Sequence, residues 1–297
     1  MAYLRRHGAT LGGDGAPSVT YPLLSLASGV LPEFTPQQAA SAAVAAGWPA
    51  VGIWVEPSTW TRATARDVRA RTEGAGIAVL DVEVIWIRPG PDDPDHLRII
   101  DAGADIGARH VLVVSSDPDP GATADKFGRL SDHAVAGGLR ACLEFAAFTT
   151  VRDLAAALDV IARAGRPEAG LLIDPLHFRR TGGAPTDLRG VDPHRFPYAQ
   201  ICDAVADGPA PQDVPAIIHE ALDLRLPLGE GALPLAELLE VLPPATPLSV
   251  ELRSKALRDS YPVPADRARA LLASTRAGLD RLTRPASPPT RSARGED

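Results

Sequence analysis

Eight short apolar runs recur along the chain, and stretches with helical character separate most of them. Segments such as TPQQAASAAVAAG (35–47) and TVRDLAAALDVIARAG (150–165) are typical of helices, because a capping residue opens each one and a glycine closes it. Near-continuous apolar runs that alternate with helices predict a parallel sheet covered on both faces. Eight such units predict an α/β fold, a closed (β/α)8 TIM barrel. The runs are LLSLASGV (23–30), AVGIWVE (50–56), IAVLDVEVIWI (77–87), HVLVVSSD (110–117), RACLEFAAF (140–148), AGLLIDPLHF (169–178), YAQICDA (198–204) and PLSVELRS (247–254).

An open doubly wound sheet is the alternative architecture for the same alternation. We expect the barrel to form a single domain over residues 20–282. The Gly-rich residues 1–19 are expected to form a flexible arm, because no strand precedes and no helix follows them, as a phosphate-binding loop would require. The Pro/Ser/Arg-rich residues 283–297 are predicted to be a disordered tail.

Composition excludes several functional classes. The 30 Lys and Arg residues against 37 Asp and Glu residues give a net charge of −7, which argues against nucleic-acid binding. No apolar run is long enough to span a membrane, and the N-terminal residues lack the apolar centre of a secretory signal. Cys142 and Cys202 lie in apolar runs and are expected to be buried thiols in a reducing compartment. We therefore expect a cytoplasmic protein that acts on a small molecule.

Polar residues stand near the ends of the last four apolar runs. They are Glu144 in CLEF, Asp174 in IDPLH, Gln200 in AQICD and Glu251 in SVELRS. The carboxyl ends of barrel strands form one rim, so these side chains are expected to converge there. Three carboxylates and an amide in one buried place need a compensating charge, which a divalent cation supplies. Oxygen ligands favour Mg²⁺ or Mn²⁺, and the imidazole of His177, three residues after Asp174, makes Mn²⁺, Co²⁺ or Zn²⁺ acceptable.

The ordered set of motifs resembles the xylose isomerase-like TIM barrels, a family of sugar phosphate isomerases and epimerases. The resemblance covers roughly residues 20–282 and is most specific in the second half of the chain. Its segments are LEF at Glu144, DPLH at Asp174 and His177, YAQICD at Gln200 and Asp203, LGEG at Glu230, and SVELRS at Glu251.

The resemblance implies a ligand set. In the ketose 3-epimerase members, the residues that match Glu144, Asp174, Gln200 and Glu251 bind one divalent metal, often Mn²⁺. The third ligand there is usually histidine, and an amide oxygen binds the later transition metals less tightly than imidazole does. The histidine often found on the third strand is also missing, and this chain has Glu83 and Trp86 there.

The family chemistry implies roles for these residues. Glu144 and Glu251 are expected to be the catalytic base and acid, which move a proton next to a carbonyl through an enediolate. His177 and Arg253 are expected to contact substrate oxygens, and Glu83 and Trp86 are further substrate-binding candidates. Arg225, which precedes the LGEG segment, matches an arginine common in relatives and is expected to order that loop.

These residues leave the outcome of the reaction open. The predicted enzyme is a metal-dependent isomerase or epimerase of a polyhydroxylated carbonyl compound. A lyase that dehydrates a keto-polyol or cyclic keto acid would use the same site, and a non-catalytic barrel subunit is a third alternative. An abasic-site endonuclease is disfavoured, because it needs a zinc cluster with more histidines and a basic groove. Relatives are often dimers or tetramers, so homo-oligomerisation also stays open.

Overall fold

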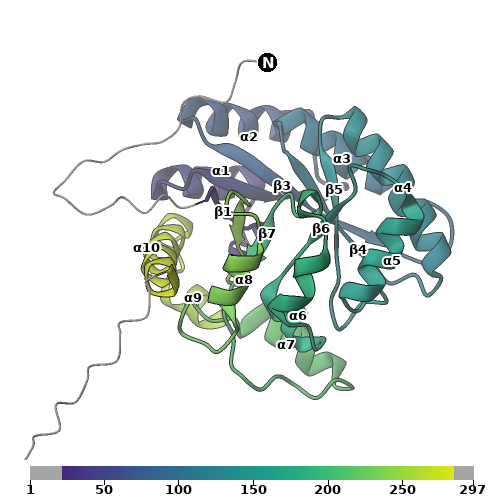
Figure 1. The fold of residues 1–297 in the computed structure, drawn as a ribbon. Helices are drawn as coiled ribbons and strands as arrows, with labels where there is room; N and C mark the ends of the chain where they lie inside the picture. Colours follow the sequence, from purple (N-terminus) through teal and green to yellow (C-terminus); the bar gives the residue numbers. More distant parts are fainter. Residues whose placement is uncertain (1–21, 284–297) are drawn as a thin grey trace, which may run out of the picture.

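The computed structural model describes residues 22–283, and its centre is one sheet of eight parallel strands (Figure 1). The sheet order is β6-β5-β4-β3-β2-β1-β8-β7, so each strand lies beside its neighbours in the chain. One parallel bridge between Ile173 and Ala199 joins the two edges and nearly closes the ring. The predicted (β/α)8 barrel is therefore confirmed. The strands are β1 (Leu24–Leu26), β2 (Ala50–Trp54), β3 (Ala78–Ile87), β4 (His110–Ser115), β5 (Arg140–Glu144), β6 (Gly170–Leu172), β7 (Ala199–Ile201) and β8 (Leu248–Val250).

Helices surround the strands, and the helix at 36–46 begins at the capping residue that the sequence predicts. The first helix is capped by Thr35, whose hydroxyl accepts a hydrogen bond from the Gln38 amide, and it ends at Gly47 with φ of 78°. The α-helices are α1 (Pro36–Ala46), α2 (Arg62–Ala75), α3 (Pro94–Ile106), α4 (Pro120–Ala136), α5 (Leu154–Ala164), α6 (Pro175–Arg180), α7 (Val214–Asp223), α8 (Leu235–Val241), α9 (Lys255–Ser260) and α10 (Pro264–Thr283). Three 3-10 turns add η1 (Ser28–Val30), η2 (Pro185–Gly190) and η3 (Pro193–Arg195).

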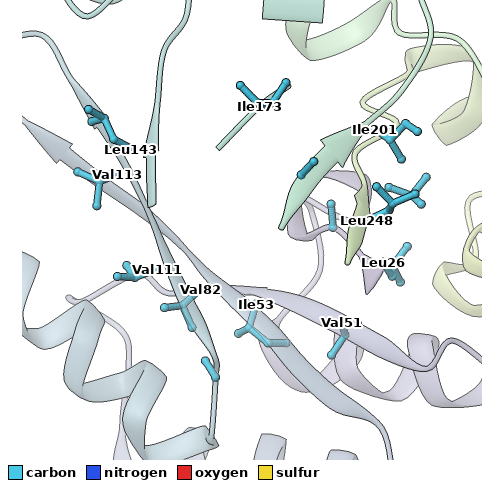
Figure 2. Packing of buried hydrophobic residues seen from close by; sticks show 14 of the residues in the cluster. Leu26, Val51, Ile53, Val82, Val111, Val113, Leu143, Ile173, Ile201 and Leu248 are labelled. Atoms are coloured by element: carbon cyan, nitrogen blue, oxygen red, sulfur yellow. The ribbon is translucent and has the colours of Figure 1, made fainter. Parts of the chain in front are cut away.

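The main apolar core lies between the strands and the helices (Figure 2). Val51, Val82, Val111 and Leu143 belong to it, each from a different strand. A smaller apolar cluster, which includes the thiol of Cys142, gathers residues from the alternate strand positions. Both expected buried cysteines are free. The two faces of each strand are thus divided, with one face toward the helices and the other toward the barrel interior.

Strand β3 is irregular, and its irregularity affects the interior. Two of its residues, Leu80 and Asp81, oppose the single residue Gly52 on β2. A second extra residue lies between Val82 and Ile85 where β3 pairs with β4. Such β-bulges re-aim side chains along a strand. They place acidic residues of β3 beside the barrel mouth.

The sixth apolar run differs from its prediction. We expected residues 169–178 to form one strand that carries both Asp174 and His177, but β6 ends at Leu172 and α6 begins at Pro175. The Asp174 side chain accepts hydrogen bonds from the amides of Leu176 and His177, and the proline takes the first helical position. An N-cap aspartate followed by proline starts a helix. His177 therefore lies on a helix.

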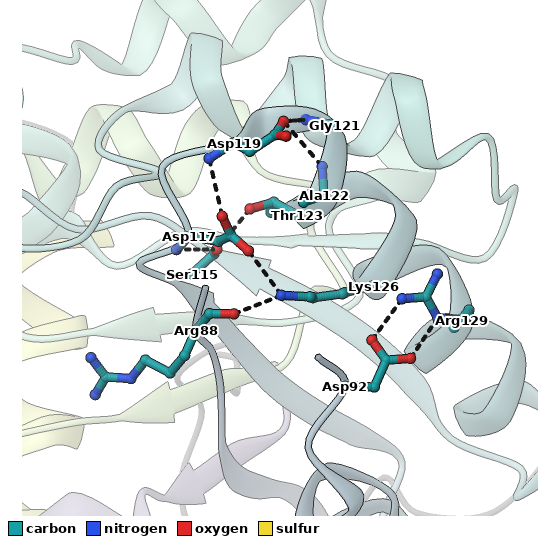
Figure 3. Close-up of polar contacts among 10 residues, drawn as sticks. All are labelled: Arg88, Asp92, Ser115, Asp117, Asp119, Gly121, Ala122, Thr123, Lys126 and Arg129. Atoms are coloured by element: carbon teal, nitrogen blue, oxygen red, sulfur yellow. Dashed lines mark hydrogen bonds and ion pairs between the residues drawn. The ribbon is translucent and has the colours of Figure 1, made fainter. Parts of the chain in front are cut away.

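A charged network lies at the junction of β4 and α4 (Figure 3). Lys126 on α4 donates to a carboxylate oxygen of Asp117 at 2.8 Å and to the carbonyl of Arg88 at 2.6 Å. The other Asp117 oxygen accepts from the Asp119 amide. Three segments of the chain are joined by these bonds.

The predicted N-terminal arm lies outside the described residues. So does the predicted tail, except for Thr283, which is the last residue of α10. Among residues 22–283, no helix combines the length and the apolar character that crossing a bilayer requires.

Candidate functional site

A cavity of about 190 Å³ opens where the expected site residues end their strands. Seven of the eight residues that the sequence singles out line it. The eighth, Asp174, is fully buried just behind them. The seven lining residues are Glu83, Trp86, Glu144, His177, Gln200, Glu251 and Arg253.

Three of these residues are close enough to share one ion. Glu144, Asp174 and His177 each offer a ligand atom, and the three atoms lie within 4.8 Å of one another. Glu144 comes from the last position of β5, while Asp174 and His177 come from the start of α6. All three side chains are buried. The sequence placed His177 near the substrate rather than among the ligands, so this grouping adds a possible nitrogen donor to the expected oxygen donors.

Asp174 is already held on both sides. One of its oxygens caps α6, and the other accepts a hydrogen bond from Arg225 at 2.5 Å. Burial by itself raises the pKa of Asp174, but the Arg225 guanidinium and His177 bring it below its usual value. Asp174 is therefore ionised at neutral pH. Each carboxylate oxygen has two lone pairs, so these bonds leave capacity for a further ligand.

Arg225 also reaches a second acid. Its guanidinium lies 3.6 Å from a carboxylate oxygen of Glu251, and its Nε donates to the carbonyl of Ala221. Arg225 was expected to order the LGEG loop, but the structure places it between two acids of the site. The loop is held instead by Asp203, whose carboxylate accepts from the amides of Gly229, Gly231 and Leu233.

Several buried oxygens at this mouth lack a hydrogen-bond donor in the described part of the chain. They are Glu83 Oε1, Glu144 Oε1 and Gln200 Oε1. The second Glu83 oxygen accepts from the Ser28 hydroxyl at 2.8 Å. Leaving a buried oxygen unpaired costs about 1–3 kcal/mol, so a cluster of them indicates a missing partner.

The acids of the mouth also resist ionisation. Burial raises the pKa of Glu144 well above its usual value, and the nearby Asp174 and Glu251 carboxylates raise it further. Burial likewise raises the pKa of Glu251 to about 7. The pKa of His177 changes in the opposite direction. Burial lowers it to about 4, which leaves a neutral imidazole at neutral pH. In the absence of a cation, this cluster favours a protonated Glu144, an ionised Asp174 and a neutral His177.

The donor set fits a divalent cation. Carboxylates, an amide oxygen and a neutral imidazole are the ligands that Mn²⁺, Co²⁺ and Zn²⁺ accept, and the two positive charges would offset the carboxylates. The unpartnered oxygens of Glu144 and Gln200 are the specific atoms that such an ion would satisfy.

Asp81 is a site neighbour that the sequence analysis missed. It is fully buried, no donor group of residues 22–283 reaches its oxygens, and its carboxyl group lies against that of Glu83, close enough for the two to share a proton. Burial raises the pKa of Asp81 to about 6, and Asp81 in turn adds to the raised pKa of Glu83. The sequence could have indicated this residue, because Asp81 lies two residues before Glu83 in the same run and strand residues two apart face the same way.

Trp86 and Arg253 complete the rim. The Trp86 indole donates to the Ser116 hydroxyl at 2.9 Å, and the Arg88 guanidinium lies 4.2 Å from the centre of its ring. The Arg253 Nε has no hydrogen-bond partner within the described segment.

The family model described as xylose isomerase-like TIM barrel matches residues 40–277. The chain belongs to this family. No curated protein matches the sequence. The family match agrees with the resemblance that the motifs of the second half carry.

Solved structures with the same fold include members of several kinds. A xylose isomerase-like TIM barrel/4-hydroxyphenylpyruvate dioxygenase fusion protein is 21% identical with a TM-score of 0.72, over 91% of this chain. The chain spans about half of that protein, 46% of its length. The IOLI protein with a binding zinc atom is 17% identical with a TM-score of 0.71, over 87% of this chain and 98% of its own. An L-ribulose 3-epimerase is 16% identical with a TM-score of 0.62, over 88% and 95% of the two chains. At these identities the likeness concerns the fold.

Proposed function

We propose that the protein is a divalent-metal-dependent isomerase or epimerase of sugars or keto-polyols. One observation carries the proposal: Glu144, Asp174 and His177 converge within 4.8 Å, beside unpartnered buried oxygens of Glu144 and Gln200. The family and the likeness to an epimerase and to a zinc-containing barrel support it. Mn²⁺ is the proposed ion, with Mg²⁺, Co²⁺ and Zn²⁺ as alternatives.

The proposed ligands are Glu144, Asp174, Gln200 and Glu251, and His177 is the nearest additional donor. A divalent cation in this place supplies Lewis-acid stabilisation of negative charge that develops on substrate oxygens. Arg225 holds the Asp174 carboxylate in position and limits the repulsion between Asp174 and Glu251.

Glu144 and Glu251 are the proposed base and acid. They come from β5 and from the end of β8, and both line the cavity. One carboxylate removes the proton on the carbon next to the substrate carbonyl, and the other returns a proton. Return to the opposite face gives the epimer. Return to the neighbouring carbon, with the hydroxyl proton passing to the former carbonyl oxygen, gives the aldose–ketose isomer. Burial raises the pKa of Glu251 to about 7 in the metal-free chain, and the positive charge of a bound cation would lower it, so that the carboxylate is ionised and able to accept a proton.

The metal content of the purified protein tests this proposal directly. We expect bound divalent metal by mass spectrometry in the wild type, and reduced content in Glu144→Gln and Glu251→Gln. Turnover of a ketose and keto-polyol panel should fall roughly 100- to 10,000-fold in these variants, the usual contribution of an acid–base group. Glu168→Gln removes an exposed carboxylate just before β6 and is the matched control, which should retain both properties.

The readouts separate the alternatives. Circular dichroism confirms that each variant is folded before its metal content is compared. Full metal content in both Gln variants would contradict the ligand set. Water loss from the substrate, seen as ultraviolet absorbance of an unsaturated product, would instead identify a lyase.

A further inference from the structure

A second, larger space lies beside the catalytic cavity. This groove encloses about 680 Å³ and is formed by the turn η1, the start of α1 and the loop between β2 and α2. Trp54 and Arg253 line both the groove and the cavity. The two spaces therefore meet at these two side chains.

The sizes of the two spaces leave room for a substrate that extends beyond the cavity. Ligand sites usually enclose roughly 300–1,000 Å³. The cavity, at about 190 Å³, is below this range, and the groove is within it. A substrate that occupied the cavity alone would leave the adjoining groove unused.

The walls of the groove combine flat aromatic faces with hydroxyl and amide groups. Phe34, Trp54 and Trp60 provide the aromatic faces. Aromatic rings bury apolar surface, and a sugar ring offers the C–H bonds of one face for such packing. A purely apolar ligand would dehydrate the polar groups without replacing their hydrogen bonds, which is costly. The polar lining residues are Ser28, Thr35, Gln37, Glu56, Thr59 and Thr64.

The charges of the groove disfavour an anionic extension such as a phosphate. Glu33 is paired with Arg267 at 2.6 Å, and Glu56 accepts a hydrogen bond from the Ser58 hydroxyl. Arg253 is the cation that lines the groove in the described residues, and two acids, Glu33 and Glu56, line it as well. A neutral ligand rich in hydroxyl groups fits this balance better than a phosphate, which favours clustered arginines.

Gly29 keeps the junction open. A Cβ atom at this position would lie 2.8 Å from a Glu251 carboxylate oxygen and 3.0 Å from the Cδ of Arg253. The turn after β1 therefore approaches both side chains closely because it carries no side chain of its own. Glu251 and Arg253 stand directly against the turn that borders the groove.

We propose, on the basis of the proposed function, that the substrate is a glycosylated ketose or keto-polyol. Its carbonyl-bearing unit occupies the cavity, and its second sugar ring occupies the groove against Trp60 and Phe34. The groove thus selects a disaccharide-like substrate over a free monosaccharide or a sugar phosphate.

Matched ligands test the proposal by affinity. D-fructose is compared with ketose disaccharides that contain it, namely turanose, maltulose, isomaltulose and lactulose, by isothermal titration calorimetry on the full chain loaded with Mn²⁺. We expect at least one disaccharide to bind about tenfold tighter than D-fructose, as a second anchored ring would give. The affinity of D-fructose 6-phosphate, measured in the same way, tests whether the groove accepts an anionic group instead of a second sugar ring.

Variants connect the preference to the groove. Trp60→Ala should bring the affinity of the preferred disaccharide down to about that of D-fructose, while Trp60→Phe keeps an aromatic face and most of the preference. Tyr261→Ala removes an aromatic side chain that is also partly exposed but does not line the groove, and it should leave the ratio unchanged.

The outcomes are separable from those of the proposed function. Disaccharides that bind no better than D-fructose, or tighter binding of D-fructose 6-phosphate than of every disaccharide, overturn the groove assignment even if fructose is turned over. Disaccharide binding that depends on Trp60 without turnover of any sugar supports the groove and contradicts the proposed reaction. The wild-type comparison decides the matter even if Trp60→Ala fails to fold.

Discussion

Two groups of buried polar side chains lie on or just after strands of the barrel and are built differently. After β4, Asp117 and Lys126 are both buried, and the charged atoms of this pair have hydrogen-bond partners (Figure 3). On β5 and β7, Glu144 and Gln200 are equally buried, yet each has an oxygen with no partner in residues 22–283. Both groups bring polar side chains into the protein, but only the first has a partner within the chain for each of its polar atoms.

This difference separates a structural role from a functional one. Buried polar groups that only support the fold are nearly always satisfied, because an unmade bond costs free energy. The pair at β4 joins three segments of the chain, and each of its charged atoms already has a partner within the chain. The unsatisfied groups at the mouth retain free oxygens, which is what a bound ion or substrate requires. The same criterion adds Asp81 to the second group.

The largest effect on stability is expected when the satisfied pair is broken. Lys126→Met removes the cation and leaves the Asp117 carboxylate buried and unpaired, so the free energy of unfolding should fall by about 3 kcal/mol. Urea denaturation measures the change. Metal content should be unaffected, because Lys126 does not line the cavity.

A double variant checks the cause. Asp117→Asn combined with Lys126→Met removes both charges, so the loss should be clearly smaller than the sum of the two single losses. Additive losses would mean that the two residues do not act as a pair. Asp117 and Lys126 would then not serve as the structural case against which the barrel mouth is compared.

The fold could be predicted because its signal is local and repeated. Each apolar run gives a strand, and each cap and glycine marks a helix end, as Thr35 and Gly47 show. The error at residues 169–178 arose because apolar periodicity hid a helix that starts at Asp174 and Pro175. The bulges of β3 were not predictable, since they depend on how β2 and β4 pair with it.

The site was predicted in part for a similar reason. Strand ends must meet at one rim, so Glu144, Gln200 and Glu251 were expected around one cavity. The partners of Arg225 were not foreseeable, because Asp174 is 51 residues away in sequence and only tertiary structure joins them. Which of His177 and Glu251 completes a ligand set also depends on distances that the sequence does not contain.

A smaller and pH-dependent effect is expected at Asp81. Its pKa is raised from 3.8 to about 6, so the folded metal-free protein holds this proton between about pH 4 and 6 while the unfolded chain releases it. The carboxyl group therefore lowers stability as pH rises through this window, by roughly 2–3 kcal/mol at neutral pH. Asp81→Asn should be as stable as the wild type near pH 4 and more stable than it at pH 7.

Thermal unfolding of the metal-free proteins across this pH range measures the difference. Asp105→Asn, at an exposed position of α3, is the control for replacing an aspartate by asparagine. A stability difference between Asp81→Asn and the wild type that does not grow with pH would show that Asp81 finds a partner in solution, and it would move this residue to the satisfied group.

The smallest effect is expected one helical turn from Lys126. Arg129 forms two hydrogen bonds with Asp92, at 2.8 and 2.6 Å, but both side chains are more than half exposed (Figure 3). Water already solvates such a pair and salt screens it, so Arg129→Ala should cost less than about 1 kcal/mol, and less still at high ionic strength. Measured beside Lys126→Met in the same urea titration, it removes one positive charge from the same helix and so compares an exposed pair with a buried one. If the two variants lost equal stability, burial would not explain the loss of stability in Lys126→Met. The presence or absence of hydrogen-bond partners on buried polar atoms would then not distinguish the β4–α4 junction from the barrel mouth.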